Sequence, residues 1–131
     1  MPGWEDSSWG YHGHDGLMVF NSEGKPFGPK FMTSDTIDTI GCCLNFRNNT
    51  VFYTRNGVNL GVAFRDLKKA LYPYVGMMST GGSVGANFGY RKFKYTVERS
   101  IATLSGKLTG ITLLIDHFGT HLDLQEKVIN L

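Results

Sequence analysis

The sequence predicts an all-β protein, and three observations carry that prediction. Glycine is abundant at 17 of 131 residues, aromatic residues make up 13% and charged residues only 18%, a composition typical of short strands joined by tight turns. Residues 40–46 alternate apolar side chains with small or polar ones, which indicates a strand with one buried face. An Asn-Gly pair at 56–57 separates two strand-like runs, and this pair is the strongest short hairpin signal.

The central part of the chain is predicted to form a three-strand antiparallel meander. Residues 40–46 end at an Arg-Asn-Asn-Thr turn, residues 51–54 run back, and Asn56-Gly57 leads into residues 58–64. Further short strands are expected at 17–20, 71–78 and 84–88, and residues 65–70 are expected to form a loop or one helical turn. Pro73 must then lie at a strand start or on a sheet edge. Many short strands at this spacing indicate a sandwich or a barrel.

The tripeptide Asp-Thr-Ile occurs twice in tandem, at 35–37 and at 38–40. Because side chains alternate along a strand, an insertion of three residues reverses the facing of everything on one side of it. We therefore expect the second copy to keep the register of the strand. The first copy is expected to lie in an extended loop or a bulge.

The character of the sequence changes at Thr96. Apolar residues recur there at spacings of three and four, which favours an amphipathic helix; they are Ile101, Leu104, Leu108, Ile111 and Ile115. Against a helix, Gly106 and Gly110 each cost about 1 kcal/mol in a helix interior, and residues 111–115 would also serve as a strand. The period favours the helix, so we divide the chain into a β domain at 1–95 and a tail at 96–131.

Charge and hydropathy argue against nucleic acid and membranes as partners. The formal net charge is only +2, and the one basic run, Arg91-Lys92-Phe93-Lys94, fits a solvated strand edge. No stretch is long and apolar enough to span a bilayer. We expect neither a nucleic-acid nor a membrane partner.

The cysteines and the amino terminus indicate a reducing compartment. Cys42 and Cys43 are neighbours, and neighbouring residues on a strand point to opposite faces, so these two are not expected to bond to each other. Residues 1–4 lack the basic start and apolar run of a secretory signal. A cytoplasmic and/or nuclear location is expected, and the sequon at Asn48 is expected to stay unglycosylated.

The stretch GWEDSSWGYHGHDG, residues 3–16, holds both tryptophans, two of the four histidines and three carboxylates. Zinc takes three or four Cys, His or carboxylate ligands. His12 and His14 could face one side of a strand, but no cysteine is near in sequence, and His117 and His121 lack the glutamate of a helical zinc motif. We expect no metal and no cofactor.

Catalysis is not expected either. Nothing pairs Asp6, Asp15 or His14 with a nucleophile or a second carboxylate for acid–base chemistry. The glycine-rich residues 79–83 open onto a strand-like segment, whereas a phosphate cradle opens onto a helix. The predicted protein is therefore not an enzyme.

Five ordered motifs carry a resemblance to a known family: PGWEDSSWGYHGHDG, GPKF, DTIGCCLNFRNNTVFYTRNGVNLGVAF, LYPYVGM and ANFG. Over residues 2–95 the chain resembles the SPRY (B30.2-type) domain of the Ran-binding-protein-M family. The resemblance implies a bent two-layer antiparallel β-sandwich without catalytic activity, whose rim loops capture short peptide segments of partner proteins. Larger members of this family act as scaffold or substrate-receptor subunits of a CTLH- or GID-type ubiquitin ligase. Residues 1–95 would correspond to the C-terminal two-thirds of the usual domain, a partial SPRY-type sandwich followed by the helical tail.

On this resemblance the opening cluster is a rim loop that leads into a strand. The candidate peptide-binding residues are Trp9, Tyr11, His12 and His14 on this loop and Met77, Ser79 and Thr80 on another. Rigid aromatic groups and exposed hydrogen-bonding groups suit a shallow site for an extended peptide. Packing alternatives exist, because Trp4 and Trp9 favour the core over a contact surface and one of Met77 and Met78 should be buried. Tyr72 and Phe88 are assigned to the core.

Two functions from different classes follow. The leading hypothesis is a protein–protein interaction module with a protein or peptide partner. The alternative is a truncated SPRY remnant without specific partner binding, whose exposed strand edges allow self-association.

Overall fold

The computed structural model describes residues 3–4, 6–31, 37–67, 71–77, 83–88, 90–95, 108–116 and 120–125, the last two segments for the backbone alone. These residues form ten strands and contain no helix. The strands are β1 (Trp9–His12), β2 (Leu17–Phe20), β3 (Glu23–Pro26), β4 (Asp38–Asn45), β5 (Thr50–Arg55), β6 (Val58–Phe64), β7 (Tyr72–Met77), β8 (Ser83–Asn87), β9 (Leu108–Asp116) and β10 (Thr120–Gln125). Among the described residues no helix is long and apolar enough to cross a membrane.

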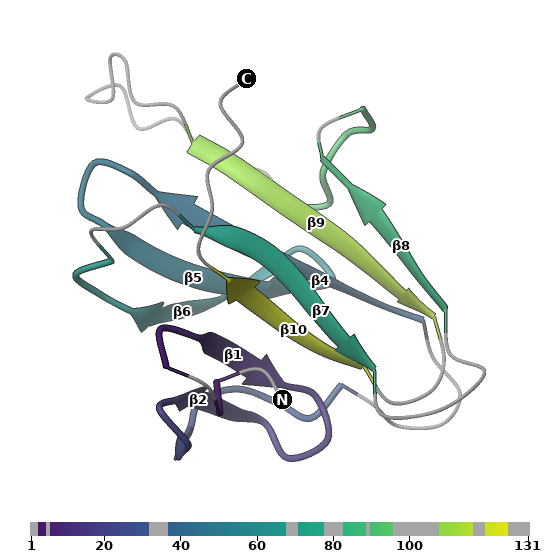
Figure 1. Cartoon of the computed structure of the whole chain (residues 1–131). Helices are drawn as coiled ribbons and strands as arrows, with labels where there is room; N and C mark the ends of the chain where they lie inside the picture. Colours follow the sequence, from purple (N-terminus) through teal and green to yellow (C-terminus); the bar gives the residue numbers. More distant parts are fainter. Residues whose placement is uncertain are drawn as a thin grey trace.

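The strands form two five-stranded antiparallel sheets. The order is β3-β2-β1-β10-β7 in one sheet and β6-β5-β4-β9-β8 in the other. In Figure 1, β10 passes between β1 and β7, and β9 runs beside β8. The all-β prediction is confirmed, and the two sheets form the expected two layers.

The two layers pack through an aromatic core. Tyr11 of β1 is fully buried, and its ring centroid lies 5.3 Å from that of Tyr53 on β5 and 5.0 Å from that of Phe31. Ile40 and Cys42 of β4 are buried in the same cluster. Because complete burial of one such side chain contributes about 1.5–3 kcal/mol, Tyr11 is a principal contact between the sheets.

The predicted meander is confirmed at residue level. β4 pairs with β5 from Ile40↔Arg55 to Asn45↔Thr50, and β5 pairs with β6. Between β5 and β6, Asn56 and Gly57 have φ angles of 51° and 88°. Positive φ at both central residues is the type I′ geometry that matches the twist of the flanking strands, so the Asn-Gly pair sets this hairpin.

The tandem repeat is resolved as predicted where the structure describes it. Asp38, Thr39 and Ile40 open β4 and are all buried. Ile37 lies before the strand and is 58% exposed. Residues 35 and 36 lie outside the described residues. The second copy therefore holds the register.

The helix predicted in the tail is wrong over residues 108–116. These residues form β9, which pairs with β4 on one side and with β8 on the other. Two partner strands satisfy the backbone N–H and C=O groups of this segment on both edges, and Gly110 and the threonines beside it disfavour a helix. Residues 101–107 lie outside the described part of the chain.

The remaining strand predictions are largely confirmed. β2, β7 and β8 fall at 17–20, 72–77 and 83–87, and Pro73 lies on β7, an edge strand. Two core assignments need correction: Phe88 is 59% exposed because it follows the end of β8, and Tyr72 is only half-buried. The strand β3 was not predicted, since Glu23–Pro26 carries two charges and a proline and is exposed throughout.

Candidate peptide-binding site

A hollow of about 440 Å³ opens where β1 begins, β2 ends and the chain leaves β6. It is lined by Asp6, Ser7, Trp9, Phe20, Asn21, Asp66 and Leu67. We call it the Trp9 pocket. Its walls come from three segments distant in sequence, one of them following a strand of the second sheet, so only the folded sandwich forms it.

One wall of the Trp9 pocket is a pair of aromatic rings. Trp9 and Phe20 are direct cross-strand neighbours on β1 and β2. Their ring centroids lie 5.2 Å apart with 5° between the ring planes, and Phe20 is 39% exposed. Buried Leu67 adds an aliphatic surface. Rigid, partly exposed aromatic surface of this kind binds an apolar side chain at little cost in conformational entropy.

The pocket loops share an uncommon backbone conformation. Ser7, Asn21 and Asp66 have φ angles of 63°, 49° and 59°, so each of the three lining segments contains a non-glycine residue in the left-handed region. Such residues persist where the surrounding structure determines the loop, and they are enriched at ligand-binding positions. Asp6 and Asp66 are exposed, and they are the charged residues among the described residues that line the pocket.

Trp4 is 58% exposed, and its backbone contacts Ser22, the residue that follows Asn21 of the Trp9 pocket. Its carbonyl oxygen accepts a hydrogen bond from the Ser22 hydroxyl at 3.1 Å, and the Gly3 carbonyl accepts one from the Ser22 amide at 2.7 Å. Gly3 has a φ of 77°, and a Cβ there would lie 2.5 Å from the Val19 carbonyl oxygen. The close approach of Gly3 to β2 therefore fixes an exposed tryptophan next to Ser22, where the sequence favoured a core residue.

The candidate binding residues do not share one rim. Trp9 is the first residue of β1 and His12 the last, and the ladder aligns His12 with His121 and then with Gly76, next to Met77. Trp9 and His12 are three positions apart, which corresponds to about 10 Å along an extended strand. Trp9 therefore belongs to the pocket, whereas His14 and Met77 lie toward the opposite end of the sheet.

Two of the candidates have no accessible surface to offer. Tyr11 is 0% exposed, its hydroxyl donates to the Pro29 carbonyl, and burial raises the pKa of Tyr11 to about 12. His12 is 2% exposed. Both side chains pack inside the sandwich. His14 and Met77 are exposed, and Ser79 and Thr80 lie outside the described residues.

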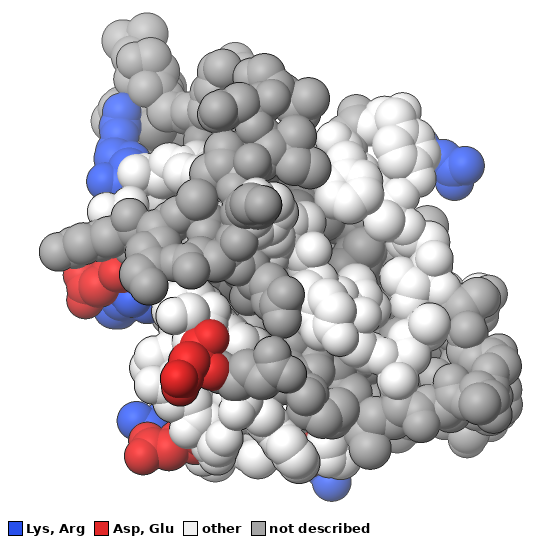
Figure 2. Space-filling view, viewed as in Figure 1, with Lys and Arg blue, Asp and Glu red and all other residues white. Residues whose placement is uncertain are grey.

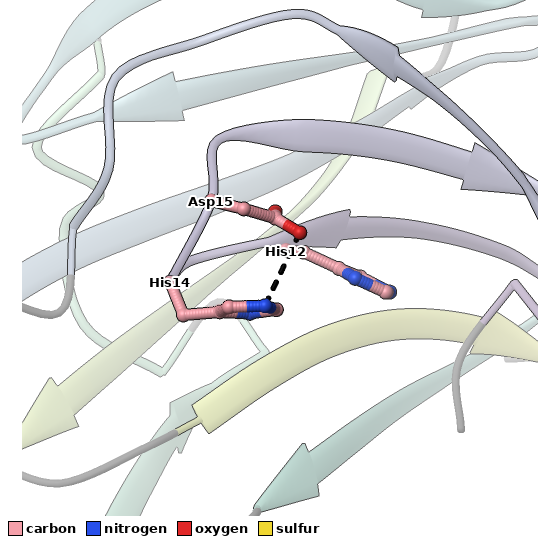
Figure 3. A group of neighbouring side chains, drawn as sticks. All are labelled: His12, His14 and Asp15. Carbon is pink, nitrogen blue, oxygen red and sulfur yellow. Dashed lines mark ion pairs between the residues drawn. The ribbon is translucent and has the colours of Figure 1, made fainter.

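The three side chains of Figure 3 are the group that could hold a metal ion. His12, His14 and Asp15 each offer a ligand atom, and these atoms all lie within 4.8 Å of one another. His14 Nε2 lies 3.2 Å from Asp15 Oδ2. This cluster is at the His12 end of β1, away from the Trp9 pocket.

The surface charge of the described residues is dispersed. Figure 2 shows Lys and Arg side chains scattered singly on the visible face, with acidic groups gathered toward the side of β1, β2 and β6. On this face the described cations form no continuous patch. Among the described residues, the Trp9 pocket is a concave feature with an aromatic wall.

A two-layer β-sandwich with an aromatic pocket between its loops is typical of a binding domain. The chain matches the SPRY domain family over residues 1–91 and belongs to that family. It is 44% identical over 131 residues to the Ran-binding proteins 9/10 homolog of Drosophila melanogaster, covering 99% of this chain. It is also 50% identical over 99 residues to human Ran-binding protein 9 and 40% identical over 99 residues to the Ran-binding protein M homolog of Arabidopsis thaliana, each covering 75% of this chain.

The similarity concerns one part of these relatives. The chain spans 13% of the length of the Drosophila and human proteins and 21% of the Arabidopsis protein. What the comparison supports is an interaction module of SPRY type, similar to the corresponding part of Ran-binding proteins 9 and 10.

Proposed function

We propose that this SPRY domain captures short peptide segments of partner proteins without catalysis, and that the Trp9 pocket receives an apolar or aromatic side chain of the peptide. The observation that carries the proposal is the stacked Trp9–Phe20 wall inside a 440 Å³ hollow. Large rigid aromatics in a concave site are the residues that dominate binding energy in protein interfaces.

The loop groups around the pocket would fix the rest of the peptide. Trp4 offers an exposed indole, and Asn21 offers an exposed amide. An extended peptide needs both kinds of contact, since its backbone N–H and C=O groups lose water on binding. His14 and Met77 remain candidates for a second contact at the far end of the sheet.

We also propose that the module serves in a scaffold or substrate-receptor subunit of a CTLH- or GID-type ubiquitin ligase, in the cytoplasm and/or nucleus. The support is the resemblance to Ran-binding proteins 9 and 10. Affinity purification of the tagged chain from cells, with mass spectrometry of the captured proteins, tests this role. Capture of ligase subunits that is lost with Trp9→Ala would support it, and their absence would contradict it.

Peptide selection tests the binding function directly. The purified chain is screened against a displayed library of random peptides, and selected peptides are titrated by calorimetry. We expect Trp9→Ala and Phe20→Ala each to weaken binding at least about 30-fold, the range of a hot-spot residue. Phe88→Ala, a change of an exposed aromatic residue after the end of β8 and outside the pocket, is the control and should leave affinity unchanged.

Two results would contradict the binding function. One is a screen that yields no peptide above background. The other is binding that Trp9→Ala, Phe20→Ala and Phe88→Ala all leave intact, which is the behaviour of an adhesive remnant with exposed strand edges. Thermal melting of each variant establishes that it is folded.

A further inference from the structure

The cluster at the far end of β1 has the composition of a metal site. His12 closes β1, and His14 and Asp15 lie in the turn that leads to β2. Figure 3 shows the His12 and His14 rings near each other and a dashed line from His14 to the Asp15 carboxylate; the ring centroids lie 5.9 Å apart with 29° between their planes. Two imidazole nitrogens and a carboxylate oxygen are thereby gathered within four consecutive residues.

The turn that carries these ligands is held from several sides. The Gly16 amide donates to the His12 carbonyl at 3.0 Å, and the Phe31 amide donates to the Gly13 carbonyl at 2.9 Å. The Leu17 amide donates to Asp15 Oδ1 at 3.0 Å. That bond orients the carboxylate and leaves Oδ2 directed at His14, the kind of outer contact that positions a metal ligand.

The three ligand side chains differ in their exposure to solvent, and this difference leaves one coordination position open to water. His12 is buried, whereas the side chains of His14 and Asp15 are 47% and 30% exposed. A site with one anchored and two accessible ligands admits water at the remaining position, as open zinc sites with three protein ligands do. In a tetrahedral site neighbouring ligand atoms lie roughly 3.4 Å apart. The His14–Asp15 separation of 3.2 Å is close to this spacing. All three ligand atoms lie within 4.8 Å of one another, so an approach of at most about 1.4 Å brings any pair to it.

The register of the sheet brings one more histidine to this end of the sheet. The β1–β10 ladder pairs the backbone of His12 with that of His121. From sequence no metal was expected, because no cysteine lies near His12 and His14 and a fourth ligand is missing. The structure supplies a third ligand in Asp15 and places three of the four histidines of the chain at one end of the first sheet.

We propose that His12, His14 and Asp15 bind a divalent transition metal ion, with zinc the first candidate and water at the open position. Imidazole nitrogen with carboxylate oxygen suits zinc and its neighbours in the first transition row, whereas magnesium and calcium take oxygen ligands alone. This site shares no residue with the Trp9 pocket, but His14 belongs both to it and to the second peptide contact considered above.

Zinc titration of the full chain tests the site. Protein freed of metal by a chelator is titrated with zinc chloride by calorimetry, and cobalt(II) is added separately to observe its visible absorption in a tetrahedral field. Asp15→Asn is the sharpest variant, because its amide oxygen can still accept the Leu17 hydrogen bond while the negative charge is removed. His14→Gln removes the exposed imidazole. Asp66→Asn, an exposed change at the Trp9 pocket, is the matched control.

We expect one zinc ion per chain and a rise in melting temperature with added zinc, since a ligand that binds only the folded state stabilises it. His14→Gln and Asp15→Asn should each weaken zinc binding by about 10- to 100-fold or more, with metal-free melting temperatures close to that of the parent. Asp66→Asn should bind as the parent does. Absence of stoichiometric zinc binding in the parent, or zinc binding that His14→Gln leaves unchanged, would overturn the proposal.

Discussion

Asp38 is a buried carboxylate that ties two strands to a turn. Its side chain is 3% exposed, and it accepts hydrogen bonds from Arg55 Nε at 3.1 Å and Arg55 Nη2 at 3.0 Å. The Asn56 side-chain amide donates to it at 2.7 Å. Asn56 also bonds to the backbone of Thr39 in both directions. Its side-chain oxygen accepts a hydrogen bond from the Thr39 backbone amide, and its own backbone amide donates one to the Thr39 carbonyl, each at 2.8 Å. The start of β4 is thus locked to the β5–β6 hairpin.

Asp38→Asn should destabilise the protein markedly. It removes the negative charge that pairs with Arg55 Nε and Nη2 and leaves the partly buried guanidinium with the Lys30 carbonyl as an acceptor. Because the Arg55 side chain is 24% exposed, we expect a loss of about 2–3 kcal/mol in the free energy of unfolding, below the 3–5 kcal/mol typical of a fully buried pair. Urea denaturation measures it, and Asp66→Asn, exposed and without such partners in the described residues, is the control. Equal stabilities of the two variants would refute the role of Asp38.

Cys43 is a buried free thiol whose burial raises its pKa to about 12. At pH 8 the folded protein therefore contains roughly a thousandfold less Cys43 thiolate than it would if this thiol kept the ordinary pKa of 9.0. The folded state favours the neutral thiol. The corresponding stability is therefore present below pH 9 and is lost as the pH rises from 9 toward 12.

Thiol labelling checks this expectation. In a Cys42→Ala variant, which leaves Cys43 as the single thiol, a maleimide or Ellman reagent should react with the folded protein at pH 8 far more slowly than with the urea-unfolded chain. The difference should shrink as the pH is raised above 9. Equal labelling rates in the folded and unfolded states at pH 8 would contradict the burial of this group.

At the scale of the element, the tandem repeat makes a deletion informative. The network around Asp38 fixes the second Asp-Thr-Ile copy, while Ile37 at the end of the first copy is 58% exposed. Deleting residues 35–37 shortens the connection between buried Phe31 and Asp38 and leaves β4 in register. Shorter loops lose less entropy on closing, so the free energy of unfolding should stay unchanged or increase. A drop of about 2 kcal/mol or more, the size of a lost core contact, would show that the first copy is packed inside.

The elements that the sequence predicted well are those whose signals are local. The type I′ turn at Asn56-Gly57 and the existence of a strand over residues 40–45 depend on neighbouring residues, and both were correct. The single buried face was wrong, because residues 38–43 are all buried and Phe46, after the strand, is 55% exposed. β9 was read as a helix because its apolar spacing suits both structures. What decides for a strand there is pairing with β4 and β8, which lie at least 20 residues away along the chain.

The candidate site could be predicted only in part for the same reason. Trp9 and Trp4 were visible as aromatic residues of a rim loop, but the register that stacks Trp9 on Phe20 is a property of the β1–β2 pair. Asp66 joins the pocket from the far side of the sandwich. Asp15, the third zinc-ligand candidate, was considered from sequence for acid–base chemistry, where it lacked a partner.

At the scale of the whole molecule, the tail supplies an inner strand to each sheet. β9 lies between β4 and β8, and β10 lies between β1 and β7. The match to the SPRY family ends at residue 91, so both strands come from outside the matched region. A segment beyond the family match therefore joins the two halves of each sheet.

Removing residues 96–131 should therefore make the protein insoluble. β4, β8, β1 and β7 would each lose a partner along one edge, and unpaired strand edges promote edge-to-edge association. A domain is stable by only about 5–15 kcal/mol in total, so we expect even residues 1–131 to be marginal and residues 1–95 to lack a cooperative fold.

A chain ending at residue 125, which keeps both β9 and β10, is the matched control and should melt as residues 1–131 do. Light scattering with size-exclusion chromatography and thermal melting compare the three. A monomeric 1–95 chain with a sharp melting transition above about 55 °C, within the ordinary range of intact domains, would disprove the structural role of the tail.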